Sequence, residues 1–240
     1  MPDVRLLLAA APYALMAAAP TAAAGQDAPR FAPPEGVPLR YETVDERDLG
    51  TATLRLRTLR ELRFDRADDG WIAQVRLVDL GSEGPESLTR MLAAPQRIMQ
   101  GVAVGWRLDA AGRPVAPVDS GTGWQQFEAA LAGLRGDLES EPLGLDRTML
   151  AGLIARLEGL DPAGRAALQW GELSPLLPLA GEGGPWRTDA DGIWRRSAPG
   201  DTNATQLVGR DGLLAESRRE DMIRVGAVTR IHRMVIRRVP

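Results

Sequence analysis

Apolar and polar residues alternate with a period of two through much of this chain. Over residues 51–65 the even-numbered positions are mostly apolar, which predicts one long half-buried strand. The same alternation runs over 71–78, and Asp69-Gly70 between the two runs is typical of a hairpin turn. These two strands are therefore expected to pair antiparallel.

Eight further runs have the character of strands. They lie at 38–46, 102–108, 115–118, 185–188, 193–197, 202–208, 213–218 and 223–239. Gly70, Gly112, Gly192 and Gly212 each end a turn dipeptide between two runs, and each is expected to adopt the positive φ that tight hairpins require. About ten strands joined mainly by hairpins predict an antiparallel sheet.

Between the two halves of the sheet the apolar period becomes that of a helix. Apolar residues recur at spacings of three and four over 124–134, and again over 150–160 behind an expected N-cap at Asp146. Asp161-Pro162 predicts the start of a third helix. A short earlier helix is expected over 85–94, ending at Pro95 because proline breaks a helix.

This order of elements predicts an α+β fold. A strongly curved antiparallel sheet of about ten strands, a half-barrel, is expected to cradle three or four helices, because a long sheet with one apolar face needs a partner layer. The helical block near 121–180 supplies that layer. Residues 37–240 are expected to form this single domain, and 25–36, rich in Pro and Ala, an extended leader into it.

The N-terminal segment has the pattern of a signal peptide. Residues 6–24 carry no charge, follow Arg5 and end in the small-residue site Ala22-Ala23-Ala24. An uncleaved membrane anchor is the alternative, but Pro12 and Pro20 make a weak span. Residues 1–24 are therefore expected to be removed. Export of a chain without Cys favours a periplasmic protein that does not span the membrane after processing.

The composition of the 240 residues argues against several function classes. All 29 basic residues are Arg, which excludes Schiff-base lysines and phosphate-loop lysines. The absence of Cys and the single His, His232, exclude thiol catalysis and His-rich metal sites, so neither a metal nor another cofactor is expected. A net charge of -3 argues against a nucleic-acid partner.

In its layout the predicted fold resembles the periplasmic lipoprotein-carrier half-barrels, in which an unclosed barrel wraps a few helices. The resemblance is one of architecture and implies an apolar ligand. The segment Pro34-Glu35-Gly36-Val37-Pro38-Leu39-Arg40-Tyr41 is similar to the start of uncharacterised secreted proteobacterial proteins with the same order of elements. That second likeness covers most of the mature chain and implies no activity.

No catalytic motif stands out in the sequence. There is no G-x-S-x-G elbow, and His232 is expected to be a sheet residue rather than a general base. Acidic residues are plentiful, but sequence spacing does not show whether two carboxylates face each other as in a glycosidase. A non-enzymatic protein is therefore expected, with a carboxylate-based hydrolase as a distant alternative.

The candidate ligand-binding residues are apolar. The segment after the helical block is rich in Leu and broken by Pro, so it neither joins a strand ladder nor continues a helix and is suited to cover a cavity. With the aromatic residues expected to face it, the candidate site comprises Trp106, Trp124, Trp170, Leu173, Leu176 and Leu177. The alternative is that the same side chains complete a filled core.

Arginines are dense in the C-terminal run. Arg230, Arg233, Arg237 and Arg238 are candidates for a patch that binds an anionic headgroup or an acidic protein partner. The alternative is solvated side chains that protect the sheet from edge pairing.

Two classes of function remain open. A binding module would hold a lipid or another amphiphile between helices and sheet. An interaction or structural protein would have a filled core and offer a sheet edge or the Arg-rich C-terminal strand to an envelope protein.

Overall fold

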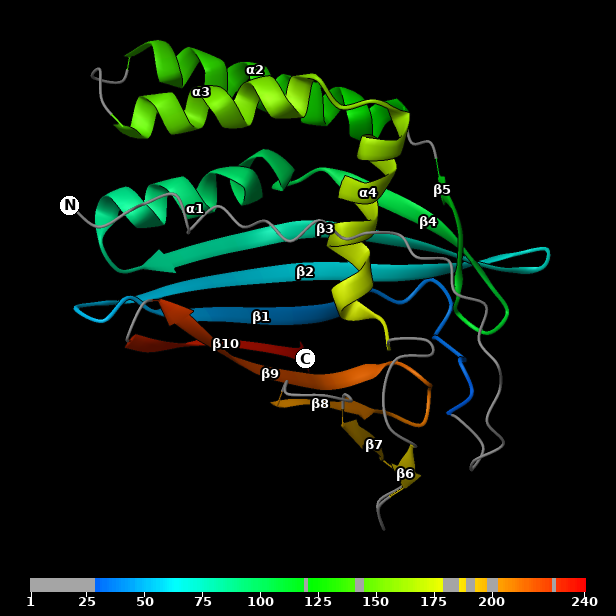
Figure 1. Cartoon of the computed structure of the whole chain (residues 1–240). Coiled ribbons are helices and arrows are strands. Elements are labelled where there is room, and N and C mark those ends of the chain that lie inside the picture. Colours follow the sequence, from blue (N-terminus) through cyan, green and yellow to red (C-terminus); the bar gives the residue numbers. More distant parts are fainter. Residues whose placement is uncertain are drawn as a thin grey trace.

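A computed structural model describes residues 29–118, 121–140, 145–178, 186–188, 193–197, 203–225 and 228–240. The expected signal peptide, residues 25–28 of the leader, Leu179 and the turn at Asp191-Gly192 lie outside the described residues. The fold is α+β, as predicted: one open antiparallel sheet is covered on part of one face by helices (Figure 1).

The sheet contains all ten expected strands. Their bounds are β1 Leu39–Asp48, β2 Thr53–Ala67, β3 Gly70–Glu83, β4 Ala103–Asp109, β5 Pro114–Val118, β6 Arg187–Thr188, β7 Trp194–Ser197, β8 Asn203–Val208, β9 Leu214–Val225 and β10 Val228–Val239. The order across the sheet is β5-β4-β3-β2-β1-β10-β9-β8-β7-β6. Every neighbouring pair is consecutive in the chain except β1 and β10, which join the two halves of the domain.

The faces of the central strands follow the predicted alternation. Leu54, Leu62 and Phe64, at even positions of β2, are buried, and this face carries the apolar core. The pairing of β2 with β3 shifts by one residue between Leu59 and Arg60, where β3 has an extra residue. The even-numbered residues of β2 therefore face odd-numbered residues of β3 near the hairpin turn and even-numbered ones at the far end.

Two predicted strand boundaries were wrong, and one of them is the end of β3, which runs to Glu83 rather than to residue 78. The prediction ended one strand at Arg218 and began the last at Ile223, whereas β9 runs on to Val225 and β10 begins at Val228. The intervening charged residues stay in the ladder because their side chains are paired across strands. Arg233 of β10, for example, donates to Glu220 of β9 at 2.7 Å.

The four helices are α1 Glu86–Met99, α2 Gly121–Ser140, α3 Leu145–Glu158 and α4 Pro162–Leu173, with a 3-10 turn η2 at Ser174–Leu176. The predicted end of α1 at Pro95 was wrong, because burial of Ile98 and Met99 holds one further turn in place. The predicted cap Asp146 lies inside α3. Asp161 does cap α4, where its carboxylate accepts a hydrogen bond of 2.7 Å from the amide of Gly164.

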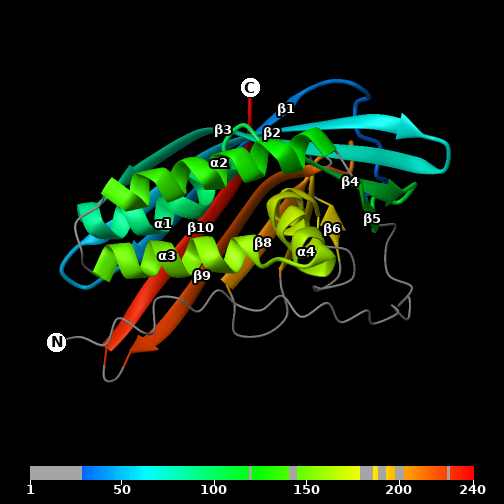
Figure 2. The same ribbon diagram turned by 90° about the horizontal axis from the view of Figure 1, so that it is seen from above.

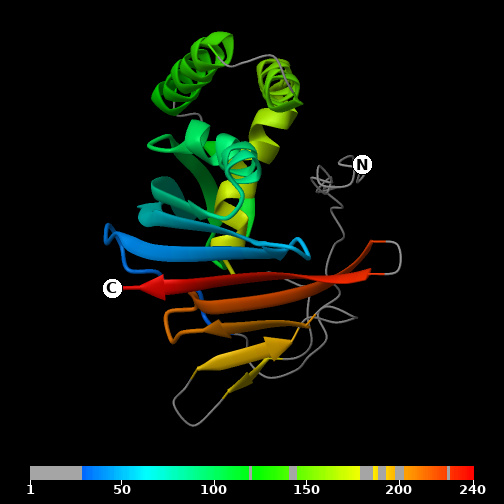
Figure 3. The same cartoon turned by 90° about the vertical axis from the view of Figure 1, so that its left-hand side faces the viewer.

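The helices gather over one half of the sheet. α1 packs on β2 and β3, α4 packs on β3, β4 and β5, and α2 and α3 form an outer layer on α1. Figure 3 shows this helical layer on the side of β3 and β4, with β6 to β10 extending away from it. The concave face is therefore covered unevenly.

Arg60 fixes the helices to the sheet. It is 8% exposed and lies on the core-facing side of β2. Its guanidinium donates to Glu172 of α4 at 3.0 Å, to Gln96 of α1 at 2.9 Å and to Thr58 at 2.5 Å. One buried side chain thus contacts both helices that touch the sheet.

The leader packs across one end of the sheet and shows how strongly the sheet curves. Phe31 makes edge contacts with Phe64 and Trp71, and the amide of Ala32 donates to the carbonyl of Asp211 at 2.9 Å. A Cβ added to Gly112 would lie 2.7 Å from the Phe31 ring, and one added to Gly212 would lie 2.7 Å from the Phe31 Cα.

Those two glycines belong to turns that would be far apart in a flat sheet. Gly112 lies in the β4–β5 turn and Gly212 in the β8–β9 turn, and β3, β2, β1 and β10 separate β4 from β9. Five strand spacings would amount to roughly 24 Å in a flat sheet. Since one residue touches both turns, the sheet bends strongly at this end.

The close approach of a neighbouring backbone also explains the glycine that follows the β2–β3 turn, Gly70. Gly112 and Gly212 have the predicted positive φ, of 80° and 71°. Gly70 does not, which corrects that prediction. A Cβ there would lie 2.1 Å from the carbonyl oxygen of Leu108, so the position admits only glycine for lack of space.

Replacing Gly212 should loosen the leader. Gly212→Ala is expected to cost roughly 1–3 kcal/mol more in free energy of unfolding than Gly101→Ala, because of overpacking. Both positions have positive φ, but an alanine at 101 meets nothing within 4 Å, whereas one at 212 would lie 2.2 Å from the carbonyl oxygen of Arg30. Denaturant titration measures the difference. Equal losses would contradict the anchoring of the leader.

Candidate functional site

The six predicted ligand-binding residues all lie in or against the apolar core between helices and sheet. Leu173, Leu176 and Leu177 are buried in the core, and the three tryptophans pack against it. Trp106 of β4 and Trp170 of α4 meet edge to face with ring centroids 5.0 Å apart. We call these six residues the tryptophan–leucine cluster.

Two indole groups in the cluster lack a hydrogen-bond partner. The N–H groups of Trp106 and Trp124 are buried, and neither donates to another described residue. Trp124 is otherwise well packed, stacked on Phe127 and covered by the guanidinium of Arg165 at 4.3 Å from its ring centroid. A buried donor without a partner costs about 1–3 kcal/mol, so each N–H is suited to an acceptor atom of a ligand.

Two surface pockets lie elsewhere. One, of about 600 Å³, is lined by residues at the start of β1 and the end of β10, and the other, of about 180 Å³, lies beside Glu46 and Arg233. Neither pocket borders the tryptophan–leucine cluster.

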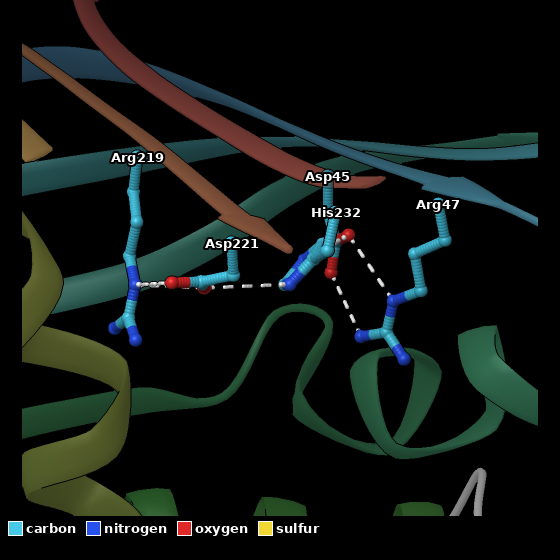
Figure 4. Close-up of polar contacts among 5 residues, drawn as sticks. All are labelled: Asp45, Arg47, Arg219, Asp221 and His232. Atoms are coloured by element: carbon cyan, nitrogen blue, oxygen red, sulfur yellow. Dashed lines mark hydrogen bonds and ion pairs between the residues drawn. The ribbon is translucent and has the colours of Figure 1, made fainter. Parts of the chain in front are cut away.

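A row of acidic and basic side chains crosses the same concave face beyond the strands on which α1 and α4 pack (Figure 4). We call it the charged row: Arg47, Asp45, His232, Asp221 and Arg219. β1 contributes the first two, β10 the histidine and β9 the last two. In the pairing of the strands Arg47 stands opposite Leu54 of the core face, and His232 stands opposite both Arg47 and Asp221. The row therefore borders the apolar core.

Basic and acidic side chains alternate along the row. His232 lies between two carboxylates, with Nε2 2.8 Å from Asp45 and Nδ1 3.8 Å from Asp221. The outer ends are arginines: Arg47 is 2.9 Å from Asp45, and Arg219 is 2.8 Å from Asp221. The three central side chains are 14–21% exposed, whereas that of Arg219 is 53% exposed. The centre is fixed, and the arginine ends reach solvent.

The environment of Asp45 stabilises its charged form. Burial raises the pKa of this carboxyl, but hydrogen bonds from His232 and Arg47 outweigh burial and lower the pKa to about 2. Asp45 is therefore ionised at every physiological pH, and it holds β1 and β10 together through the row.

Sequence reasoning did not find the charged row. It placed His232 correctly in a strand, but the two acids beside it come from β1 and β9, and Asp45 is 187 positions away. The alternation of His232 with Met234 and Ile236 on one face was the available signal. The identity of the cross-strand neighbours depends on the β1–β10 pairing, which no local pattern reveals.

The four candidate arginines of the C-terminal run do not share one surface. Arg233 and Arg237 lie on the convex face, where they pair with Glu220 and Glu42. Arg230 and Arg238 lie on the opposite face. There Arg230 donates to the carbonyl of Leu49, and Arg238 pairs with Asp211.

Three further findings concern metal binding, membrane-spanning helices and similarity to known proteins. Among the described residues, no three His, Cys, Asp or Glu side chains are arranged to hold a metal ion. Over the same ranges, no helix is long and apolar enough to cross a membrane. No protein-family model, curated protein or solved structure matches the chain.

The lowered pKa of Asp45 predicts acid sensitivity. Because its folded pKa of about 2 is below its ordinary 3.8, Asp45 contributes stability above pH 4 and loses it as the pH falls towards 2. Asp45→Asn should therefore lower the free energy of unfolding by about 2 kcal/mol more at pH 5 than at pH 2. Urea titrations at both pH values measure this. The exposed Asp68, which lies outside the row, provides the matched Asp→Asn control. A similar change in both variants would contradict the role of the row.

Proposed function

We propose that this protein is a non-enzymatic binding module for an amphiphile. One observation carries the proposal: a single concave sheet face changes from apolar under the helices to charged where the helices end. An amphiphile has the same division between an acyl chain and a polar headgroup.

The apolar part of the ligand would lie against the tryptophan–leucine cluster. The unpartnered indole N–H groups of Trp106 and Trp124 offer donors to an ester or carboxyl oxygen in otherwise apolar surroundings. The adjoining η2 turn and Leu177 are held by side-chain packing rather than by a strand ladder, so they can move aside at lower cost than the sheet.

The polar part would contact the charged row. The arginine ends, half-buried Arg47 and exposed Arg219, suit a phosphate or carboxylate, and the acids between them suit a cationic or hydroxyl-bearing group. The resemblance in layout to the lipoprotein-carrier half-barrels agrees with this proposal.

The filled-core interaction protein is the second candidate. Leu173, Leu176 and Leu177 are only 0–4% exposed, which favours it. Under this alternative the indole N–H groups stay unsatisfied, and the concave face contacts an envelope protein.

A fluorescence titration separates the two functions. Lysophosphatidylglycerol, added below its micelle concentration, should give a saturable shift of Trp emission. Trp106→Phe keeps an aromatic ring but removes the N–H, so it should weaken binding about threefold to tenfold, the effect of one hydrogen bond. Trp186→Phe, in contact with Arg196 elsewhere, is the matched control and should change nothing. No response to this ligand, to fatty acids or to phospholipids would favour the filled core.

We also propose that the chain is exported to the periplasm, on the strength of the uncharged segment 6–24 and its small-residue end. Protein recovered from cells should begin at Gly25, as intact-mass analysis would reveal. A chain that kept residues 6–19 and stayed in the membrane fraction would contradict the cleavage.

A further inference from the structure

The β9–β10 hairpin extends beyond the rest of the sheet. Among the described residues, β8 pairs with β9 as far as Glu220, and β1 pairs with β10 from His232 onward. Within that part of the chain, residues 221–225 and 228–231 form ladder pairs only with each other. Figure 2 shows the two strands continuing past the end of β8. We call these residues the β9–β10 ribbon; it projects roughly 15 Å at the usual rise per residue.

The ribbon exposes large apolar side chains. Met222 is 70% exposed, Ile223 48% and Val228 54%. These are three of the five exposed large apolar side chains among the described residues, and the other two, Val37 and Val115, lie far from them in the chain. A two-stranded ribbon is marginal in water by itself, so this clustering indicates a surface that becomes covered.

The apolar side chains stand on both faces of the ribbon. Met222 is opposite Ile231 on the convex side, whereas Ile223 and Val228 point to the concave side. A flat protein partner would cover one side and leave the other in water. The interface of a lipid bilayer surrounds an inserted ribbon and can cover both of its faces.

The charge of the ribbon is complementary to an anionic surface. Arg224 is exposed, and neither it nor Arg230 pairs with an acid among the described residues. The two acids nearby are already paired, Asp221 with Arg219 and Glu220 with Arg233. The ribbon therefore carries uncompensated positive charge beside its apolar side chains, the combination that binds peripheral proteins to anionic lipid.

We propose that the β9–β10 ribbon docks the protein on an anionic phospholipid bilayer. Met222, Ile223 and Val228 insert at the level of the headgroups, and Arg224 contacts lipid phosphate. The edges of the ribbon keep their unpaired backbone groups in the hydrated headgroup region, because burial of those groups in hydrocarbon is costly.

Vesicle flotation tests the proposal with the intact protein. Vesicles of phosphatidylcholine and phosphatidylglycerol should bind it, and vesicles of phosphatidylcholine alone should bind it much less. Met222→Ser with Ile223→Ser should lower the partition coefficient about tenfold or more. Arg224→Gln should lower it about fivefold, and 0.5 M NaCl should weaken binding of the unaltered protein.

Val115→Ser is the matched control, because Val115 is 58% exposed on β5 and lies outside the ribbon. It should leave vesicle binding unchanged. Absence of binding to anionic vesicles, or equal loss in the control, would overturn the proposal. So would a dimer in sedimentation that the double serine variant dissociates, since the ribbon would then bind a second copy.

This inference does not depend on the proposed amphiphile site. The double serine variant should keep the normal unfolding temperature and the normal response to lysophosphatidylglycerol. Loss of vesicle binding with an intact titration supports the ribbon. Vesicle binding without any titration response would reject the amphiphile site and leave the ribbon in place.

Discussion

The shape of this protein depends on a close approach of backbone around Phe31. The ring packs on Phe64 and Trp71, while the β4–β5 and β8–β9 turns come so near that Gly112 and Gly212 have no room for a Cβ. Drawing these turns together bends the sheet at one end. The bend creates the concave face, and that face gives the helices an apolar surface to cover. A segment that the sequence pattern describes only as a Pro-rich leader thus packs against the core.

Arg60 determines where on that face the helices rest. Its bonds to Glu172 and Gln96 link α4 and α1 to one point of β2. The removal of two charges from water offsets much of the attraction in such a buried pair, so we assign Arg60 and Glu172 to the choice of helix position rather than to net stability. Leucines alone would pack with the sheet at several helix positions. A guanidinium that donates to three fixed acceptors allows only one helix position. Because the helices rest on β2 to β5, the part of the face that carries the charged row lies beyond them.

Local patterns predicted the parts of the fold that local chemistry controls. The alternation along β2 indicated the buried face, and Asp161-Pro162 indicated the start of α4, because each depends on residues a few positions apart. Where long-range contacts decide, the predictions differed from the structure: Ile98 and Met99 carry α1 past Pro95, and Leu108 explains Gly70. The tryptophan–leucine cluster could be proposed from composition because apolar residues gather in any core. The charged row could not, since its members become neighbours only through the pairing of the first strand with the last.

The charged row lies where the β9–β10 ribbon leaves the sheet. Among the described residues, Asp221 is the first residue of β9 beyond the pairing with β8, and His232 is the residue at which the pairing of β10 with β1 begins. His232 lies 2.8 Å from Asp45 of β1 and 3.8 Å from Asp221 of β9, so together with the bond from Arg230 to the Leu49 carbonyl it braces the root of the ribbon. In the proposed function, this places the headgroup site directly behind the segment proposed to touch the bilayer. An amphiphile leaving the membrane along the ribbon would meet the arginine ends of the row before its acyl chain reached the cover of the helices. The charged row would then serve two purposes, supporting the root of the ribbon and receiving the polar end of the ligand.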